Sequence, residues 1–254
     1  MIKLFITDLD GCISTPFKKP DWNVLSEIRR INEQHVDDMA VPPLSICSGR
    51  PQPYVEAVAQ WLGIRHPVSF ESAGIFHIDK SEIEFLPVFN RKAEKQVHEL
   101  KQWLKDEIIA DYSGMMLEFT KRMDAGIIHA EKEVIDEAYP KITSYISDRY
   151  PLFEAHKTDV SVNVILSDNN KRNGVLTLCE RFGIKPEEAA YIGDSSGDIP
   201  ALEVVGRPFA PSNAADVVKD HAEVLDLEVT EAVLKAYRLI IRENREVLSE
   251  KLSG

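Results

Sequence analysis

The stretch IKLFITDLDG, residues 2–11, decides the fold. Its first six residues are mostly apolar, and half of them are β-branched, which predicts a buried strand. Asp8 and Asp10 follow at once, and side chains two apart in an extended segment point the same way. Gly11 then allows the backbone to turn and to approach a ligand closely. Alone, the two acids also fit an ordinary turn after a strand, but carboxylates at the end of a parallel strand lie where such sheets bind ligands.

The alternation of strands and helices around this stretch predicts a parallel sheet covered by helices. Before residue 71 the pattern predicts helices over 22–33 and 51–62 and strands over 44–47 and 68–70. From residue 171 it predicts a helix over 172–182 that Gly183 ends, a strand over 189–192, and helices over 199–205, 214–220 and 229–252. These two parts form one α/β domain with a Rossmann-like parallel sheet.

The middle of the chain has a different rhythm, which indicates an inserted domain. Its pattern predicts a hairpin over 75–78 and 82–88, a helix over 91–107, strands over 115–120 and 125–130, a helix over 131–150, and strands over 152–156 and 160–166. Paired strands with amphipathic helices between them are typical of an antiparallel sheet with helices on one face. We therefore expect an α/β core, residues 1–78 and 167–254, and an inserted α+β cap domain, residues 79–166.

Composition excludes several classes of protein. The chain of 254 residues carries a net charge of −12, which argues against nucleic-acid binding and would repel an anionic substrate unless a few local cations hold it. No apolar run reaches the roughly 18–20 residues that span a bilayer, so we expect a cytoplasmic protein without a membrane partner. Cys12, Cys47 and Cys179 form no CxxC pair and are expected to be reduced, in or near the core.

Three further segments carry chemical groups to the predicted strand and helix ends. Ser48-Gly49-Arg50 follows a strand and opens a helix, where it fits an anion site or a simple N-cap. Lys171 begins the helix after the insert and on its own would be a solvated lysine. The run GDSSGD, residues 193–198, ends another strand and supplies Asp194 and Asp198, in either a cation site or a flexible loop.

Together these groups predict a site for phosphoryl chemistry. Four clustered carboxylates would repel one another, and a divalent cation such as Mg²⁺ relieves that repulsion. A lysine and a hydroxyl would neutralise the phosphoryl oxygens, and a carboxylate nucleophile would divide the displacement into two easier steps through an aspartyl-phosphate.

The ordered set of motifs resembles that of the haloacid-dehalogenase-like (HAD) phosphatase superfamily. The resemblance implies that Asp8 is the nucleophile and that Asp10 protonates the leaving group and then activates water. It also implies phosphate binding by Ser48, Gly49 and Lys171, and Mg²⁺ binding by Asp8, Asp10 (through its carbonyl), Asp194 and Asp198. The insert between the second and third motifs resembles that of the sugar-phosphatase branch. Cys12, Arg172 and Gly197 depart from the branch pattern, which usually has threonine, glycine and asparagine at these places, without replacing a catalytic group.

The expected substrate is a small phosphorylated metabolite, such as a sugar phosphate. The segment 117–121, LEFTK, resembles a cap segment near the sugar site of that branch, although a surface ion pair between strands is the favoured interpretation. The candidates for substrate specificity are Arg50, Glu118, Lys121, Arg122 and His129. A phosphosugar mutase on the same scaffold and a non-enzymatic phospho-acceptor switch are the alternative functions. For the C-terminal helix, packing on its own core is favoured over pairing in a homodimer.

Overall fold

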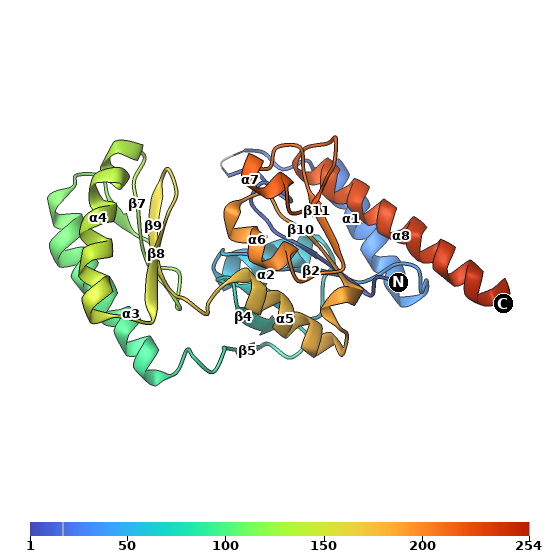
Figure 1. Ribbon diagram of the computed structural model, residues 1–254, viewed down its shortest axis with the longest axis horizontal. Coiled ribbons are helices and arrows are strands. Elements are labelled where there is room, and N and C mark those ends of the chain that lie inside the picture. The colour runs from blue at the N-terminus through green and yellow to red at the C-terminus, as the bar shows by residue number, and fades with distance from the viewer. Residues whose placement is uncertain (17, 254) are drawn as a thin grey trace. The chain divides into compact units, whose positions relative to one another are not determined.

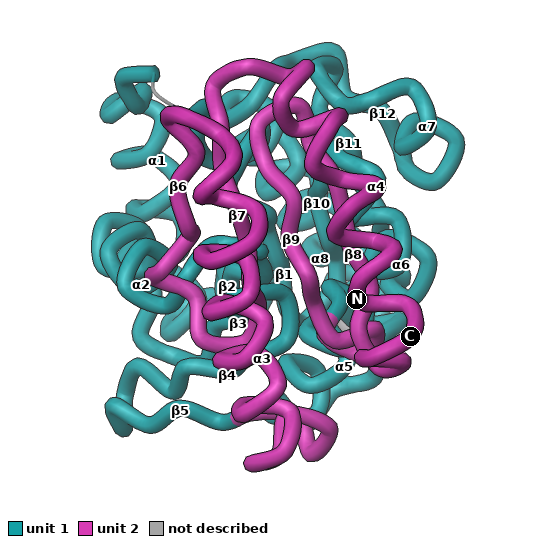
Figure 2. Tube along the Cα trace, turned by 90° about the vertical axis from the view of Figure 1, so that its left-hand side faces the viewer, with its two compact units in different colours: residues 1–84, 170–254 teal, residues 85–169 magenta. Residues whose placement is uncertain are grey.

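The computed structural model describes residues 1–16 and 18–253, which divide into two compact units. The first unit contains residues 1–84 and 170–254, and the second contains residues 85–169 (Figure 1; the units are coloured separately in Figure 2). The unit boundaries therefore fall six and three residues after the predicted domain boundaries. No helix of the described residues is both long and apolar enough to cross a membrane.

A parallel sheet organises the first unit. Its order is β12-β11-β10-β1-β2, with β1 (Leu4–Thr7) at the centre between β10 (Ala189–Ile192) and β2 (Leu44–Ile46). Every residue of these three strands is buried, as expected of a sheet covered on both faces. Thr7 pairs with Ile192 on one side and Ile46 on the other, so the three strands end on one line. The residues that follow these strands are thereby brought to one edge of the sheet.

The helices of the first unit lie close to their predicted positions. They are α1 (Trp22–Asn32), α2 (Gln52–Trp61), α5 (Lys171–Phe182), α6 (Ile199–Leu202), α7 (Asp216–Lys219) and α8 (Val229–Ser253). Gly183 ends α5 with a φ of 65°, as predicted. By contrast, α6 and α7 are shorter than expected. The sequence pattern also missed β11 (Arg207–Ala210) and the short β12 (Glu223–Val224), which begin with charged residues, and β11 also contains Pro208, a residue unfavourable in strands.

A small antiparallel sheet of β3 (Val68–Phe70), β4 (Gly74–His77) and β5 (Glu82–Glu84) belongs to the first unit. The predicted boundary at residue 78 divides this hairpin, whereas both of its strands belong to the first unit, where Ile75 packs into the core cluster that contains Cys47 and Val175. The prediction that β3 joins the parallel sheet is also wrong. Among the described residues, the strand pairing between β3 and that sheet is limited to one isolated bridge, from Ser69 to Cys47.

The end of β5 is fixed to α5 by an ion pair. Arg181 donates from Nε to Glu84 Oε2 at 2.9 Å and also from Nη2 to Oε1. His77 lies 3.0 Å from the same carboxylate. The Arg181 guanidinium holds the pKa of Glu84 at about 2, well below its ordinary value. The last residue of the first unit before the insert is thus attached to the helix that follows the insert.

The second unit is an α+β structure, as predicted. Its antiparallel sheet has the order β6-β7-β9-β8, formed by β6 (Met116–Leu117), β7 (Ala125–Ile128), β8 (Phe153–Lys157) and β9 (Ser161–Leu166). Both α3 (Arg91–Trp103), which continues as irregular helical turns to Asp111, and α4 (Lys132–Arg149) cover one face of this sheet (Figure 1). The rings of Trp103 and Tyr145 stack at 3.7 Å and join the two helices.

Candidate active site

Carboxylates gather where the parallel strands end. Asp8 directly follows β1, and Asp194 lies two residues after β10. One oxygen from each of Asp8, Asp194 and Asp198 lies within 4.8 Å of the others. Asp8 is only 4% exposed and Asp198 is completely buried. The structure therefore brings these three predicted site residues together.

Lys171 supplies the positive charge of this cluster. It is the first residue of α5, and its Nζ lies 2.8 Å from Asp8 Oδ2 and 2.6 Å from Asp198 Oδ1. Burial alone would lower the pKa of Lys171, but the carboxylates of Asp198 and Asp8 raise it well above its ordinary value. Lys171 is buried, so the alternative of a solvated lysine is wrong.

Gly174 allows α5 to lie close enough for this contact. A Cβ at Gly174 would lie 2.1 Å from the carbonyl oxygen of Ser72 and 3.0 Å from Cys47 Sγ. Such overlap would push the helix away from the loop after β3. The absent side chain one turn after Lys171 therefore helps to place its ammonium group beside the carboxylates.

Asp198 closes the loop 193–198 on itself. Its Oδ2 accepts hydrogen bonds from Asp194 N at 3.2 Å, Ser195 N at 2.9 Å and Ser195 Oγ at 2.8 Å. Its Oδ1 accepts from Lys171 and from the Tyr191 hydroxyl at 2.5 Å. Burial alone would raise the pKa of Asp198, but Lys171, Tyr191 and the loop N–H groups lower it. The loop is thus an ordered turn around a buried carboxylate, so the flexible-loop alternative is wrong.

Tyr191 and Ser195 were missed by sequence reasoning. Tyr191 lies inside the apolar run AAYI, and alternation along a strand buried on both faces does not tell which face a side chain takes. Ser195 is one of two adjacent serines, and only the fold of the loop distinguishes them. Both donate to Asp198 and so position the carboxylate that holds Lys171.

Replacing Tyr191 by phenylalanine is expected to lower kcat about tenfold with little change in KM. It should also reduce the free energy of unfolding by about 1.5–3 kcal/mol, because a buried carboxylate loses a hydrogen-bond donor. Tyr237→Phe is the matched control, since the Tyr237 hydroxyl donates to the carbonyl of Pro42 in the core at 2.6 Å. Urea unfolding should show losses in both variants, whereas only Tyr191→Phe should change kcat. Equal kinetics in both variants would contradict a positioning role.

The surroundings of Asp8 and Asp194 fit a hard cation. Burial raises the pKa of Asp8 to about 7, with Lys171 opposing and Asp198 adding to the shift. Burial, followed by the charge of Asp198, raises the pKa of Asp194 to about 6. Asp8 Oδ1 is buried with no hydrogen-bond partner among the described residues. Clustered carboxylates whose mutual repulsion a cation would relieve suit Mg²⁺, which takes oxygen ligands.

Gly11 admits Asp194 to this place. Its φ is +73°, and a Cβ there would lie 1.9 Å from Asp194 Oδ2. The predicted sharp turn after Asp10 is thus present. The structure adds the second reason for glycine, which is the close approach of a carboxylate rather than of a ligand.

Asp10 and Arg50 form a separate pair at the edge of the cluster. Arg50 donates from Nε to Asp10 Oδ2 at 2.6 Å and from Nη2 to Oδ1 at 3.0 Å. Both side chains are about one-third exposed. The guanidinium of Arg50 also lies 5.1 Å from the centre of the Tyr54 ring. The residue predicted as the acid and base is therefore engaged by a residue predicted for specificity.

Ser48 and Gly49 lie beside β1 because β2 pairs with it. Cys47 N donates to the carbonyl of Thr7 at 3.0 Å, so the residues after it run next to Asp8. Ser48 is buried, and its hydroxyl accepts from Arg50 N at 3.3 Å. Because α2 begins only at Gln52, the prediction that Ser48 opens a helix is wrong. Among the described residues, a Cβ at Gly49 would contact only Ser72 Oγ, at 3.8 Å, which leaves space beside its backbone.

The predicted specificity residues of the second unit fall into two groups. Lys121 is buried, with its Nζ 3.2 Å from Glu118 Oε2, 3.0 Å from Asp124 Oδ2 and 3.1 Å from Asn163 Oδ1. The interpretation of a surface ion pair between strands is therefore wrong, because Lys121 is buried and Glu118 is half-buried, and the two lie in the segment that leads from β6 to β7. Arg122 binds Glu94, and His129 contacts the carbonyl of Ser113, so these two side chains have other partners than the Lys121 group.

Comparison with known proteins identifies relatives over nearly the whole chain. A family model described as haloacid dehalogenase-like hydrolase matches residues 74–236. The phosphoglycolate phosphatase of Methanopyrus kandleri is 27% identical over 256 residues, which cover 96% of this chain and 99% of that protein. The phosphoglycolate phosphatase of Methanococcoides burtonii is 24% identical, covering 93% of this chain and 95% of that protein.

Solved structures share the fold. A crystal structure from Thermoplasma acidophilum has a TM-score of 0.73 at 22% identity and covers 94% of this chain and 98% of its own. The sucrose-phosphatase of Synechocystis, solved with sucrose and phosphate, has a TM-score of 0.68 at 15% identity with the same coverages. The predicted α/β fold class is thereby confirmed.

Proposed function

The chain belongs to the haloacid dehalogenase-like hydrolases and has the enzyme class predicted from its sequence, that of an HAD-type phosphatase; on this premise we propose that it hydrolyses a small phosphomonoester through an aspartyl-phosphate on Asp8. One observation carries the proposal. Lys171 holds Oδ2 of Asp8, whereas Oδ1 has no hydrogen-bond partner among the described residues. A carboxylate fixed through one oxygen presents the other as a nucleophile.

In the first step, Asp8 attacks phosphorus and the bond from phosphorus to the leaving oxygen breaks. The leaving oxygen takes a proton from Asp10. In the second step, Asp10 removes a proton from water, which attacks the aspartyl-phosphate and releases inorganic phosphate and free Asp8. Lys171, the Ser48 hydroxyl and the backbone at Gly49 bind the phosphoryl oxygens in both steps and stabilise their charge.

Arg50 controls when Asp10 acts. Both oxygens of Asp10 accept hydrogen bonds from Arg50, so this pair opens before Asp10 transfers a proton. An anionic substrate group that binds Arg50 would open it. We therefore assign Arg50 to substrate binding, in line with its predicted role in specificity.

Asp8 and Asp194, with the carbonyl of Asp10, would hold Mg²⁺. The ion, when bound, would neutralise negative charge on the transferring phosphoryl group. Asp198 supports this site indirectly, because both of its oxygens already accept hydrogen bonds from the protein.

Mg²⁺ is expected to raise the melting temperature by about 5 °C or more at pH 8, and much less at pH 5. The pKa values of Asp8 and Asp194, about 7 and about 6, lie above the ordinary 3.8, so both groups hold a proton at pH 5. Ionisation of the folded protein therefore costs stability as the pH rises through these values, and a bound cation offsets that cost. Thermal scans with and without Mg²⁺ measure the effect. Equal shifts at both pH values, or an undiminished shift in Asp194→Asn, would contradict this site.

The substrate is a small phosphorylated metabolite, and residues 85–169 serve as the cap that selects it. Phosphoglycolate is the first candidate substrate, because the curated relatives are named as phosphoglycolate phosphatases. Sugar phosphates are further candidates, because the fold is shared with sucrose-phosphatase. Lys121 and Glu118 are proposed to contact the part of the substrate away from the phosphate.

Phosphate release from a panel of phosphoglycolate and hexose phosphates, with and without Mg²⁺, tests the proposed function. Isomerisation of a hexose phosphate without phosphate release would favour a mutase. A phospho-Asp8 that lasts for hours would favour a phospho-acceptor switch.

Lys121→Met should raise KM for the true substrate at least tenfold, whereas Lys105→Met, an exposed lysine of the same unit, should not.

A further inference from the structure

The outer face of α8 carries charges that are arranged for a partner. The inner face is fixed to the core by buried side chains such as Ala236, Tyr237 and Ile240. Asn244 donates to the carbonyls of Ile2 and Ala40. Beyond Asn244 the described side chains of α8 are exposed or half-buried, and the helix continues as a long C-terminal extension (Figure 1).

A row of exposed residues runs along this helix at intervals of four. It reads Arg238, Arg242, Glu246 and Glu250, with two positive charges followed by two negative charges. Residues four apart lie on one ridge of a helix. The order of the charges is antisymmetric about residue 244, so the ridge is complementary to a copy of itself that runs in the opposite direction.

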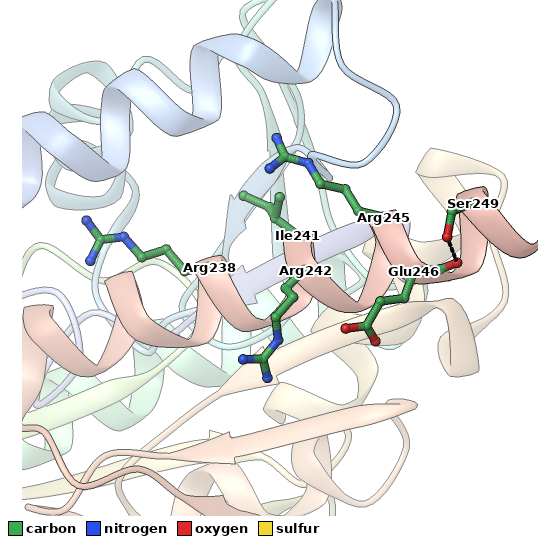
Figure 3. A pocket seen from close by; sticks show the side chains of 6 residues that line it. All are labelled: Arg238, Ile241, Arg242, Arg245, Glu246 and Ser249. Carbon is green, nitrogen blue, oxygen red and sulfur yellow. Dashed lines mark hydrogen bonds between the residues drawn. The ribbon is translucent and has the colours of Figure 1, made fainter.

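A groove of about 530 Å³ accompanies this ridge (Figure 3). Its lining comes entirely from α8 and consists of Arg238, Ile241, Arg242, Arg245, Glu246 and Ser249. These residues form two successive sets with the spacing i, i+3, i+4, i+7, the spacing of the hole that receives a side chain from a facing helix. The lining residues therefore have the spacing that a facing helix packs against.

The charges of the groove do not suit a free anion. Arg238 binds Glu27, and Arg245 Nη2 lies 3.1 Å from Asp38 Oδ2, so two of the three arginines are already neutralised. Arg242 and Glu246 form no ion pair within 4 Å, with each other or with other described residues, although both project to the same side of α8 in Figure 3. Arg242 and Glu246 therefore fit a partner surface that places a negative group opposite Arg242 and a positive group opposite Glu246.

We propose that α8 pairs antiparallel with α8 of a second copy of this chain, about a twofold axis level with residue 244. This pairing sets Arg242 of each copy opposite Glu246 of the other, and it places Glu250 opposite Arg238, which keeps its ion pair with Glu27. A twofold interface uses the same patch on both copies, which is the symmetry that the charge order requires.

An apolar contribution comes from the segment beside α8. Val36 and Met39 are each 76% exposed, and they flank Asp38, which binds Arg245. Specific interfaces bury about 800 Å² on each partner, more than one row of charged residues supplies. Val36 and Met39 extend the contact with side chains that otherwise face water.

Mass measurement by analytical ultracentrifugation tests the pairing. The chain of 28.7 kDa should sediment as a dimer at micromolar concentration and dissociate as salt is raised. Arg242→Glu alone and Glu246→Arg alone should each weaken the dimer at least tenfold, because each creates two like-charge contacts. Mixing these two variants should restore a dimer, since the glutamate introduced in one copy then faces the arginine introduced in the other.

The controls separate this interface from other effects. Glu107→Arg, a charge reversal at an exposed site of the second unit, should leave the dimer unchanged. Circular dichroism and phosphatase activity should be the same for all variants, because none lies in the active site. A monomeric wild-type chain, single variants that remain dimeric, or a mixture of the two that stays monomeric would each overturn the proposal.

Discussion

Asp8→Asn is expected to reduce phosphate release at least about 10⁴-fold, since the amide is not a nucleophile that forms an aspartyl-phosphate. The rate of phosphate release in a single turnover, measured with the enzyme saturated by substrate, gives this decrease in rate without a contribution from KM. The variant should fold, because asparagine has the shape of aspartate and its side-chain oxygen still accepts from Lys171. In metal-free buffer near pH 8 it should melt no lower than the wild type, since it removes a buried charge that Asp198 repels.

Asp21→Asn is the matched control for this prediction. Asp21 caps α1 by accepting hydrogen bonds from Asn23 N and Val24 N, and asparagine is an equally good cap. Activity should therefore be unchanged there. Phosphate release by Asp8→Asn above a few per cent of wild type would mean that another residue attacks phosphorus.

Lys171→Met is expected to lower both activity and stability. Activity should decrease about 10³-fold, because the phosphoryl oxygens lose their buried cation. The free energy of unfolding should decrease by about 3–5 kcal/mol, since Asp8 and Asp198 would be left close together without a compensating charge. Phosphate assays and urea unfolding at one pH and one Mg²⁺ concentration measure the two effects.

The neighbouring Arg172 provides the control for Lys171. Arg172 is exposed at the next position of the same helix, so Arg172→Met changes the net charge equally without touching the cluster. It should alter activity less than twofold. Lys171→Arg should restore part of the stability but little of the activity, because a guanidinium does not replace an ammonium group between two carboxylates. Equal losses of activity at both positions would show that the net charge of the chain, and not the contact of Lys171 with the carboxylates, determines the activity.

The sequence was sufficient to predict the α/β core, the inserted α+β unit and the acidic cluster. The reason is that Asp8 directly follows one buried apolar strand and Asp194 lies two residues after another, and parallel strands that neighbour one another end at one edge of a sheet. Lys171 was identified only together with the other motifs, since a lysine at a helix start has no pattern of its own.

Contacts between distant segments were not predictable in the same way. The bond from Tyr191 to Asp198 depends on which face of β10 the tyrosine takes, and periodicity does not give this for a strand buried on both sides. The predicted domain boundary divided the hairpin of β4 and β5, yet both strands belong to the first unit and Ile75 is buried in its core. The Asp10–Arg50 pair joins residues forty apart, and nothing local indicates it.

The ion pair between Glu84 and Arg181 has a consequence for engineering. Glu84 is the last residue before the insert and is held at the C-terminal end of α5, whereas the chain re-enters at Asn170, the N-cap of the same helix. Arg181, which holds Glu84, follows Asn170 by eleven residues, so at a rise of 1.5 Å per residue these points of the helix lie about 17 Å apart. A flexible linker of about eight residues spans that distance, so we expect residues 85–169 to be replaceable by such a linker, and the shortened chain should retain the strands and the carboxylate cluster.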